Sequence, residues 1–147
     1  MSMSRRQFSM ASVAALGAVG INPLAAAEPA VNRRIFLASR PVGKPSTENF
    51  RQESVAIPEV GDGEVLLRTR YLSLDPYMRG RMNAGKNYAQ PQPLGEPMIG
   101  GTVGEVAESK NAKFKVGQTV QCMGGWQAYS LINADMPGAL KHVNAEK

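Results

Sequence analysis

The sequence predicts a mainly β protein, a barrel or a sandwich, and three observations support this fold class. Short apolar runs recur between residues 34 and 132, and glycine or proline turns separate them. Residues 64–74 alternate their side chains with the period of two that a strand requires. Beyond residue 30, no segment shows a long helical period. Evenly spaced short strands of this kind are typical of all-β barrels and sandwiches.

Six segments are expected to form the strands, in chain order 34–39, 50–57, 64–74, 98–106, 119–123 and 126–132. Pro41 and Pro58 end the first two, because proline cannot donate a backbone hydrogen bond to a sheet. The third segment gives the strongest signal, since Val65 and Leu67 share one face of the strand while Leu66 lies on the other.

A short helix is predicted to begin directly after the strongest strand. Asp75 is a preferred N-cap residue, because its carboxylate can accept the free N–H groups of a first helical turn. Pro76 suits the first helical position, where its missing N–H costs nothing. Tyr77 and Arg79 therefore fall at a strand-to-helix corner, which is equally common as a ligand contact and as a purely structural corner.

The composition excludes several classes of protein. The 147 residues are 43% hydrophobic and 20% charged, which suits one globular domain with or without a processed leader. Cys122 and His142 are the only cysteine and histidine, so the chain can form neither an internal disulfide nor a zinc site of three or four such ligands. The net charge is +5, but basic residues are scattered among acids, and no nucleic-acid-binding signature occurs.

The start of the chain resembles a twin-arginine signal peptide. Arg5 and Arg6 precede an uncharged Ala/Gly/Val/Leu run at residues 11–27, which ends in three alanines. We therefore expect a signal peptide at 1–27, a domain at 28–147, and export of the folded protein to the periplasm. A membrane-spanning helix and an untranslocated tail are the alternatives, although the apolar run is short for a span.

Three motifs resemble the amino-terminal domain of one enzyme group. They are YLSLDPYMRGRM at residues 71–82, GGTVG at 100–104 and GGWQ at 124–127. Together with residues 32–41, they are similar to the zinc-independent medium-chain dehydrogenase/reductases, the group of leukotriene B4 12-hydroxydehydrogenase/prostaglandin reductases, 2-alkenal reductases and curcumin reductase. The resemblance extends over about residues 32–131.

The resemblance implies a GroES-like, partly open β-barrel with short helical turns, which forms one wall of an active-site cleft. It also implies NADPH-dependent, metal-free reduction of the C=C bond of α,β-unsaturated carbonyl compounds (enones and enals). Phenol hydroxyls are neutral donors suited to the enolate that develops in this reaction, so Tyr77 and Tyr88 are identified as catalytic and substrate-binding. The further substrate-binding residues that the resemblance implies are Arg79, Cys122, Met123 and Gly124.

Each of these residues has a structural alternative. Tyr77 could cap the barrel with its hydroxyl bound to backbone, and Tyr88 could simply be exposed in a proline-rich loop. Met123 is of a residue type that more often fills a core. Arg79 and Arg81 more often hold local structure than bind a ligand.

No motif for holding a nicotinamide cofactor is identified in the sequence. Gly100, Gly101 and Gly104 look like half of a dinucleotide fingerprint, but no helix follows them, and close backbone packing in a strand is the better interpretation. The family's Rossmann turn has no counterpart here. We expect a chain incomplete for catalysis alone, with a separate Rossmann domain or a second copy as partner.

Two other functions remain open. The domain could be a stand-alone periplasmic module that binds apolar carbonyl compounds in the old cleft wall. It could also be the inactive product of a truncated gene.

Overall fold

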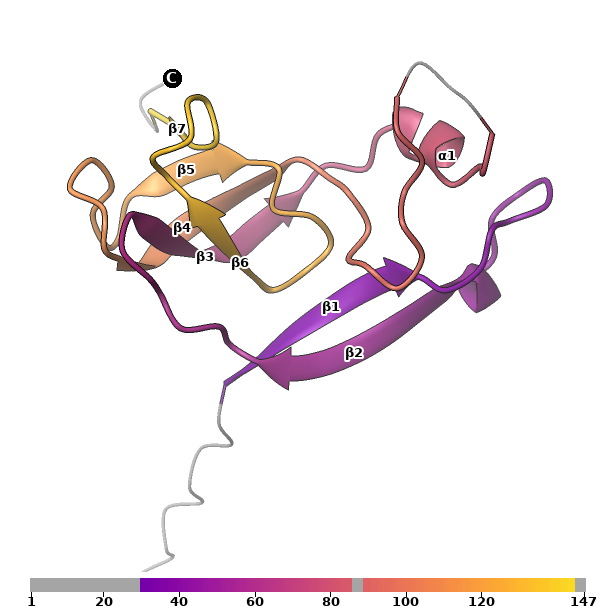
Figure 1. Ribbon diagram of the computed structural model, residues 1–147, viewed down its shortest axis with the longest axis horizontal. Coiled ribbons are helices and arrows are strands. Elements are labelled where there is room, and N and C mark those ends of the chain that lie inside the picture. Colours follow the sequence, from indigo (N-terminus) through magenta and orange to yellow (C-terminus); the bar gives the residue numbers. More distant parts are fainter. Residues whose placement is uncertain (1–29, 86–88, 145–147) are drawn as a thin grey trace, which may run out of the picture.

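The computed structural model of the chain describes residues 30–85 and 89–144 (Figure 1). The expected signal peptide at 1–27 and the candidate residue Tyr88 lie outside the described residues, so both remain predictions. Within the described ranges, no helix is long and apolar enough to cross a membrane.

Seven antiparallel strands build the described part of the domain. They are β1 (Val31–Leu37), β2 (Phe50–Ala56), β3 (Glu64–Leu72), β4 (Thr102–Ser109), β5 (Thr119–Cys122), β6 (Tyr129–Asn133) and β7 (Lys141–His142). The first two form a small sheet, and the other five pair in the order β6-β3-β4-β5-β7 (Figure 1). Neither sheet closes on itself. The predicted mainly β, partly open fold is confirmed.

Backbone hydrogen bonds connect the two sheets. The N–H of Ile35 in β1 donates to the carbonyl of Trp126 at 2.8 Å, and the N–H of Ala128 donates back to Arg33 at 2.8 Å. The N–H of Met98 also donates to Ile35, at 2.9 Å. The small sheet is therefore joined to the segments that lead into β4 and β6.

The register of β3 departs from the regular alternation that the sequence suggests. Val65 and Leu67 share one face as predicted and both are buried there, but Leu66, predicted on the other face, is also only 5% exposed. Both faces of this end of β3 are covered. Two register shifts against β4, one between Leu66 and Leu67, interrupt the ladder, and such irregularities bend a strand.

The largest apolar cluster belongs to the five-stranded sheet. We call it the strand cluster, and its buried members are Val65, Leu67, Val106, Phe114, Val120, Cys122, Ala134 and Leu140. Inward-facing residues of β3, β4 and β5 supply its centre, as the period of two requires.

The fourth predicted strand begins later than expected. Residues 98–101 bond irregularly, because Met98 accepts from the N–H of Trp126 at 2.8 Å and Gly100 accepts from Gly125 at 3.0 Å. These bonds use the backbone groups that a regular ladder would need, so β4 starts at Thr102. The short strand β7 and the 3-10 turn η1 (Thr47–Asn49) were not predicted.

The predicted helix is present as α1 (Tyr77–Arg81), but its predicted cap is wrong. Pro76 occupies the N-cap position, no side chain caps the helix, and Asp75 contributes only its backbone carbonyl to the N–H of Met78 at 3.1 Å. The helix packs on what we call the methionine cluster. Its buried members are Leu37, Met78, Met82 and Met98.

Candidate active site

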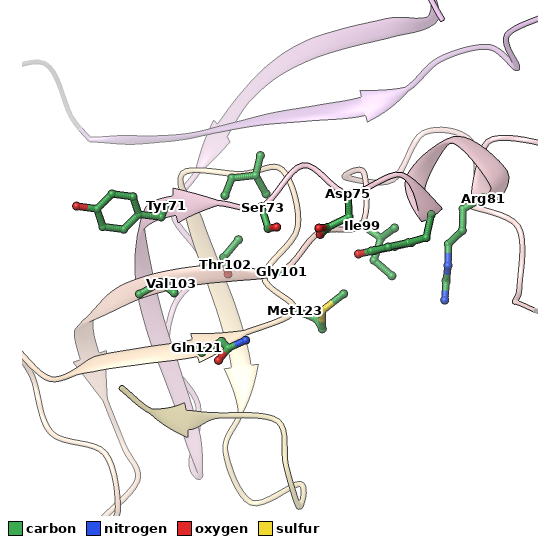
Figure 2. A pocket seen from close by; sticks show the side chains of 12 residues that line it. Tyr71, Ser73, Asp75, Arg81, Ile99, Gly101, Thr102, Val103, Gln121 and Met123 are labelled. Atoms are coloured by element: carbon green, nitrogen blue, oxygen red, sulfur yellow. The ribbon is translucent and has the colours of Figure 1, made fainter. Parts of the chain in front are cut away.

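A concavity of about 530 Å³ lies beside α1, where the ends of three strands meet (Figure 2). Figure 2 shows Tyr71 and Ser73 on one segment, Thr102 and Val103 on the next, and Gln121 beyond them. Its lining combines apolar side chains with a few hydroxyl, amide and charged groups. A hollow of this size and composition suits a small organic ligand.

Tyr77, the first residue of α1, lines this concavity. Its half-buried ring packs against the methionine cluster, and the guanidinium carbon of Arg81 lies 6.0 Å from the ring centroid. The ring is therefore held between apolar side chains and a cation on its own helix. Tyr77 both caps local packing and borders the hollow, so the two sequence-based readings of it describe the same position.

Arg81 extends along the same concavity and also lines a neighbouring hollow of about 400 Å³ (Figure 2). Its Nε atom is buried and has no hydrogen-bond partner among the described residues. The sequence had favoured a purely structural role for this arginine. The structure places its permanent positive charge where two hollows adjoin, and the structural role of Arg81 stays a prediction.

Arg79 points to a different neighbourhood and is not among the described residues that line the main concavity. Its Nη2 donates to the carbonyl of Gly43 at 2.7 Å, and its Nη1 donates to Oδ1 of Asn83 at 2.7 Å. A further contact of 3.4 Å reaches the carbonyl of Pro41. The guanidinium therefore fastens the loop after β1 to α1, and substrate binding by Arg79 remains an untested prediction.

The three candidate residues at the end of β5, Cys122, Met123 and Gly124, are placed differently from one another. Met123 is 57% exposed and lines the main concavity, the adjoining hollow beside Arg81, and a third hollow of about 330 Å³. Of these three hollows, as the described residues form them, Gly124 borders the second and Cys122 the third. Of these candidates, Met123 is the one that the described structure brings together with Tyr77.

The glycines before and within β4 make close packing contacts. A Cβ on Gly104 would lie 2.7 Å from the backbone oxygen of Arg68 on β3, and one on Gly100 would lie 2.9 Å from Leu72. Side chains cannot be accommodated against a neighbouring backbone at that distance. These contacts agree with the interpretation of Gly100 and Gly104 as packing residues, whereas a Cβ on Gly101 would meet only the sulfur of Met123, at 3.9 Å, among the described residues.

The described residues do not fit a dinucleotide. All strand pairings are antiparallel and α1 has five residues, so this part of the chain has no parallel βαβ unit with a glycine-rich turn at a helix N-terminus. The same part of the chain has no group of three metal-ligating side chains. The arrangement can hold an apolar molecule and offer its polar atom a phenol or a guanidinium.

Sequence reasoning missed Tyr71, Thr102 and Gln121 as lining residues. They come from three different strands, and no local motif marks them. Their proximity depends on the registers between β3, β4 and β5, which place Tyr71 opposite Val103 and Thr102 opposite Cys122. The alternation of exposed and buried positions on β5 could have indicated Gln121 once β5 was paired.

Known proteins match most of this chain. The family described as the N-terminal domain of oxidoreductase matches residues 33–140. The NADPH-dependent curcumin reductase of Escherichia coli (strain K12) is 50% identical over 104 residues, which are 71% of this chain and 30% of that protein. The 2-alkenal reductase (NADP(+)-dependent) of Nicotiana tabacum is 36% identical over 111 residues, 72% of this chain and 32% of that protein.

A solved structure matches at the level of the fold as well. The crystal structure of CurA in complex with NADPH from Vibrio vulnificus is 47% identical, with a TM-score of 0.71 over 78% of this chain and 33% of that one. This chain therefore spans about a third of the length of the relatives it matches.

Proposed function

The chain belongs to the family of oxidoreductase N-terminal domains, and we propose from this premise that it forms the substrate side of an enone or enal reductase. The relatives are NADPH-dependent curcumin and alkenal reductases, and the match covers the segments that build the concavity. The observation that carries the proposal is the placement of the Tyr77 phenol in an apolar hollow next to a cationic side chain.

The chemistry of an activated double bond fits this hollow. An enone is a mostly apolar molecule with one strong acceptor, its carbonyl oxygen, and the apolar walls bury the first part while a hydroxyl meets the second. Reduction at the β-carbon increases the negative charge on that oxygen. A donor aimed at developing charge stabilises the transition state more than the ground state. We assign this donor role to Tyr77, with Tyr88 as the second candidate.

The reductant is assigned to a different part of the enzyme. NADPH supplies a hydride in the relatives' reaction class, and the described residues offer no dinucleotide cradle, so we propose that a Rossmann domain, on this or another polypeptide, completes the cleft. What this chain contributes is orientation of the substrate, exclusion of water by its apolar walls, and a hydrogen bond to the carbonyl oxygen. Tyr71 is 74% exposed at the edge of the hollow, where a covering domain would bury it.

We also propose that the protein is exported to the periplasm. The support is the arginine pair and apolar run of the first 27 residues, described above from the sequence. Fusion of residues 1–30 to a reporter that folds before export checks this, with Arg5→Lys and Arg6→Lys together as the control. Retention of the wild-type fusion in the cytoplasm would contradict it.

A ligand titration tests the proposed function. The chain is titrated with trans-chalcone and with 2-cyclohexen-1-one, and binding is followed by heteronuclear NMR shifts at residues around the hollow. Tyr77→Phe removes one hydroxyl and is expected to weaken binding about 3- to 10-fold, the equivalent of one hydrogen bond. Tyr71→Phe is the matched control, because its ring is also at the hollow but largely in solvent. Equal affinities for all three chains, or no shifts at these residues, would refute the proposal.

A further inference from the structure

A buried polar cluster lies at the wall of the candidate site, and its member Thr102 also borders the main concavity. Thr102 is 3% exposed and Ser130 is 2% exposed, and the thiol of Cys122 is also buried. The Oγ1 atom of Thr102 lies 3.3 Å from the Cys122 sulfur. It accepts a hydrogen bond from the backbone N–H of Gly124 at 3.2 Å. One hydroxyl therefore contacts the residues on both sides of Met123.

The cluster leaves no room for a side chain at Gly124. A Cβ there would lie 2.5 Å from Oγ1 of Thr102, 2.9 Å from Oγ of Ser130 and 3.3 Å from the sulfur of Cys122. The space behind the turn is thus filled by polar atoms of three side chains. The amide of Gly124 is bonded to Thr102 on this inner side, and the preceding Met123 is 57% exposed.

Met123 stands where three hollows meet. It lines the main concavity of about 530 Å³, the hollow of about 400 Å³ beside Arg81, and the third of about 330 Å³ next to β7. Its sulfur lies 3.9 Å from the position that a Cβ on Gly101 would take, so the thioether crosses the start of β4. A methionine side chain is flexible by itself. Met123 can separate the hollows in a fixed position only if hydrogen bonds restrain the backbone that carries it.

We infer that Thr102 is a positioning residue, whose hydroxyl holds the 122–124 turn so that Met123 separates the three hollows and limits the width of the substrate space. If the chain binds enones as proposed above, the partition formed by Met123 makes the site select against bulky enones; this part of the inference rests on the proposed function. Loss of the hydroxyl frees the turn, lets Met123 move, and joins the hollows. The backbone effect itself needs no substrate, so it can be measured separately.

Two pairs of chains isolate the hydroxyl. Wild type and Thr102→Val differ by a hydroxyl for a methyl, and Thr102→Ser and Thr102→Ala differ by the hydroxyl alone. The second pair keeps the test valid if valine does not fold at this position. Thr119→Val is the matched control, because Thr119 lies on the neighbouring strand β5 with its side chain exposed.

The first readout is hydrogen exchange at the Gly124 amide together with the Met123 methyl resonance. In each pair, the chain without the hydroxyl is expected to exchange Gly124 at least about tenfold faster, as loss of one buried hydrogen bond allows, and to show a shifted or broadened Met123 methyl signal. Thr102→Ser is expected to behave as wild type at both probes. Unchanged Gly124 exchange in both pairs would overturn the inference.

The second readout is the ratio of affinities for trans-chalcone and 2-cyclohexen-1-one. Chains without the hydroxyl are expected to shift this ratio at least about threefold toward the bulkier chalcone, while Thr119→Val leaves it unchanged. A ratio that does not change despite a freed Gly124 would refute the role of Met123 as the partition. If no chain binds either enone but Gly124 still responds to the hydroxyl, the proposed function fails and the positioning by Thr102 stands.

Discussion

The strand cluster and the methionine cluster show two ways in which this chain buries apolar surface. The first is built by regular strands, and its central residues are Val65, Val106 and Val120. The second joins β1, α1 and the segment before β4, and three of its four buried members are methionines. Branched side chains on paired strands have few rotamers, whereas methionine has several.

The candidate site borders the adaptable cluster rather than the rigid one. Tyr77 and Ile99 pack against the methionine cluster and also line the main concavity. A rigid sheet with a flexible apolar corner allows ligands of different shape to be accommodated without loss of the fold.

Truncation of a buried side chain to alanine should lower the free energy of unfolding more in the strand cluster than in the methionine cluster. Leu67→Ala, in the strand cluster, is expected to lower the free energy of unfolding by about 3–4 kcal/mol, because paired strands cannot collapse onto the cavity. Met98→Ala, in the methionine cluster, is expected to cost about 2 kcal/mol, because neighbouring methionines can refill the space. Both residues are essentially inaccessible, at 1% and 0% exposure. Urea unfolding measures the difference, and equal losses would contradict the comparison.

Gly101 and Gly104, at the start of β4, test how closely the chain is packed where the two clusters adjoin. Gly104→Ala is expected to lower stability by about 1–3 kcal/mol, because the new Cβ meets the backbone of β3 at 2.7 Å and backbone cannot yield. Gly101→Ala is expected to change stability by less than about 0.5 kcal/mol, because the only contact there is the flexible Met123 at 3.9 Å. Thermal unfolding of both variants checks this. A tolerated Gly104→Ala would mean that the β3–β4 spacing is adjustable.

Substitution of Arg79 tests whether its hydrogen bonds between α1 and the loop after β1 contribute to stability. Arg79→Ala is expected to lower stability by about 1 kcal/mol and to raise hydrogen exchange in residues 41–45, because it removes the bonds to Gly43 and Asn83. Arg79→Lys keeps the charge without the planar fork and should be intermediate. Reduced enone affinity at unchanged stability would instead make Arg79 a substrate-binding residue, as the family resemblance implies.

The smallest effect is expected at an exposed ion pair on the sheet. Arg70 Nη2 lies 2.6 Å from Glu105 Oε2, and this hydrogen bond and charge hold the pKa of Glu105 below its ordinary value of 4.5. A depressed pKa in the folded state adds stability above the ordinary value, and this stability is lost as the pH falls through the folded pKa.

Glu105→Gln should therefore flatten part of the acid limb of a stability–pH curve below about pH 4.5. Glu108→Gln, on the same strand, is the matched control and should keep that limb. Both are followed by urea unfolding at a series of pH values. An acid limb that is the same with glutamine at position 105 would show that solvent screens the pair completely.

Much of the strand cluster could be predicted from the sequence. The alternation over residues 64–74 placed Val65 and Leu67 on one face of a strand, and turn residues gave most strand positions, because a period of two is a local property of the chain. The corner after the strongest strand was also predicted, and the substrate contact assigned to Tyr77 there stays a prediction. The N-cap at Asp75 was wrong, because Pro76 takes that position and no side chain caps the helix.

The class of fold, the family and two residues that line the concavity, Tyr77 and Met123, therefore follow from the sequence, since each depends on nearby residues or on a recognisable motif. Tertiary structure alone decided which residues share the concavity. Thr102, Gln121 and Arg81 come together through strand registers and hydrogen bonds between segments distant in the chain. It also separated Arg79 from Arg81, two arginines in one motif, because positions two apart on a helix face different directions.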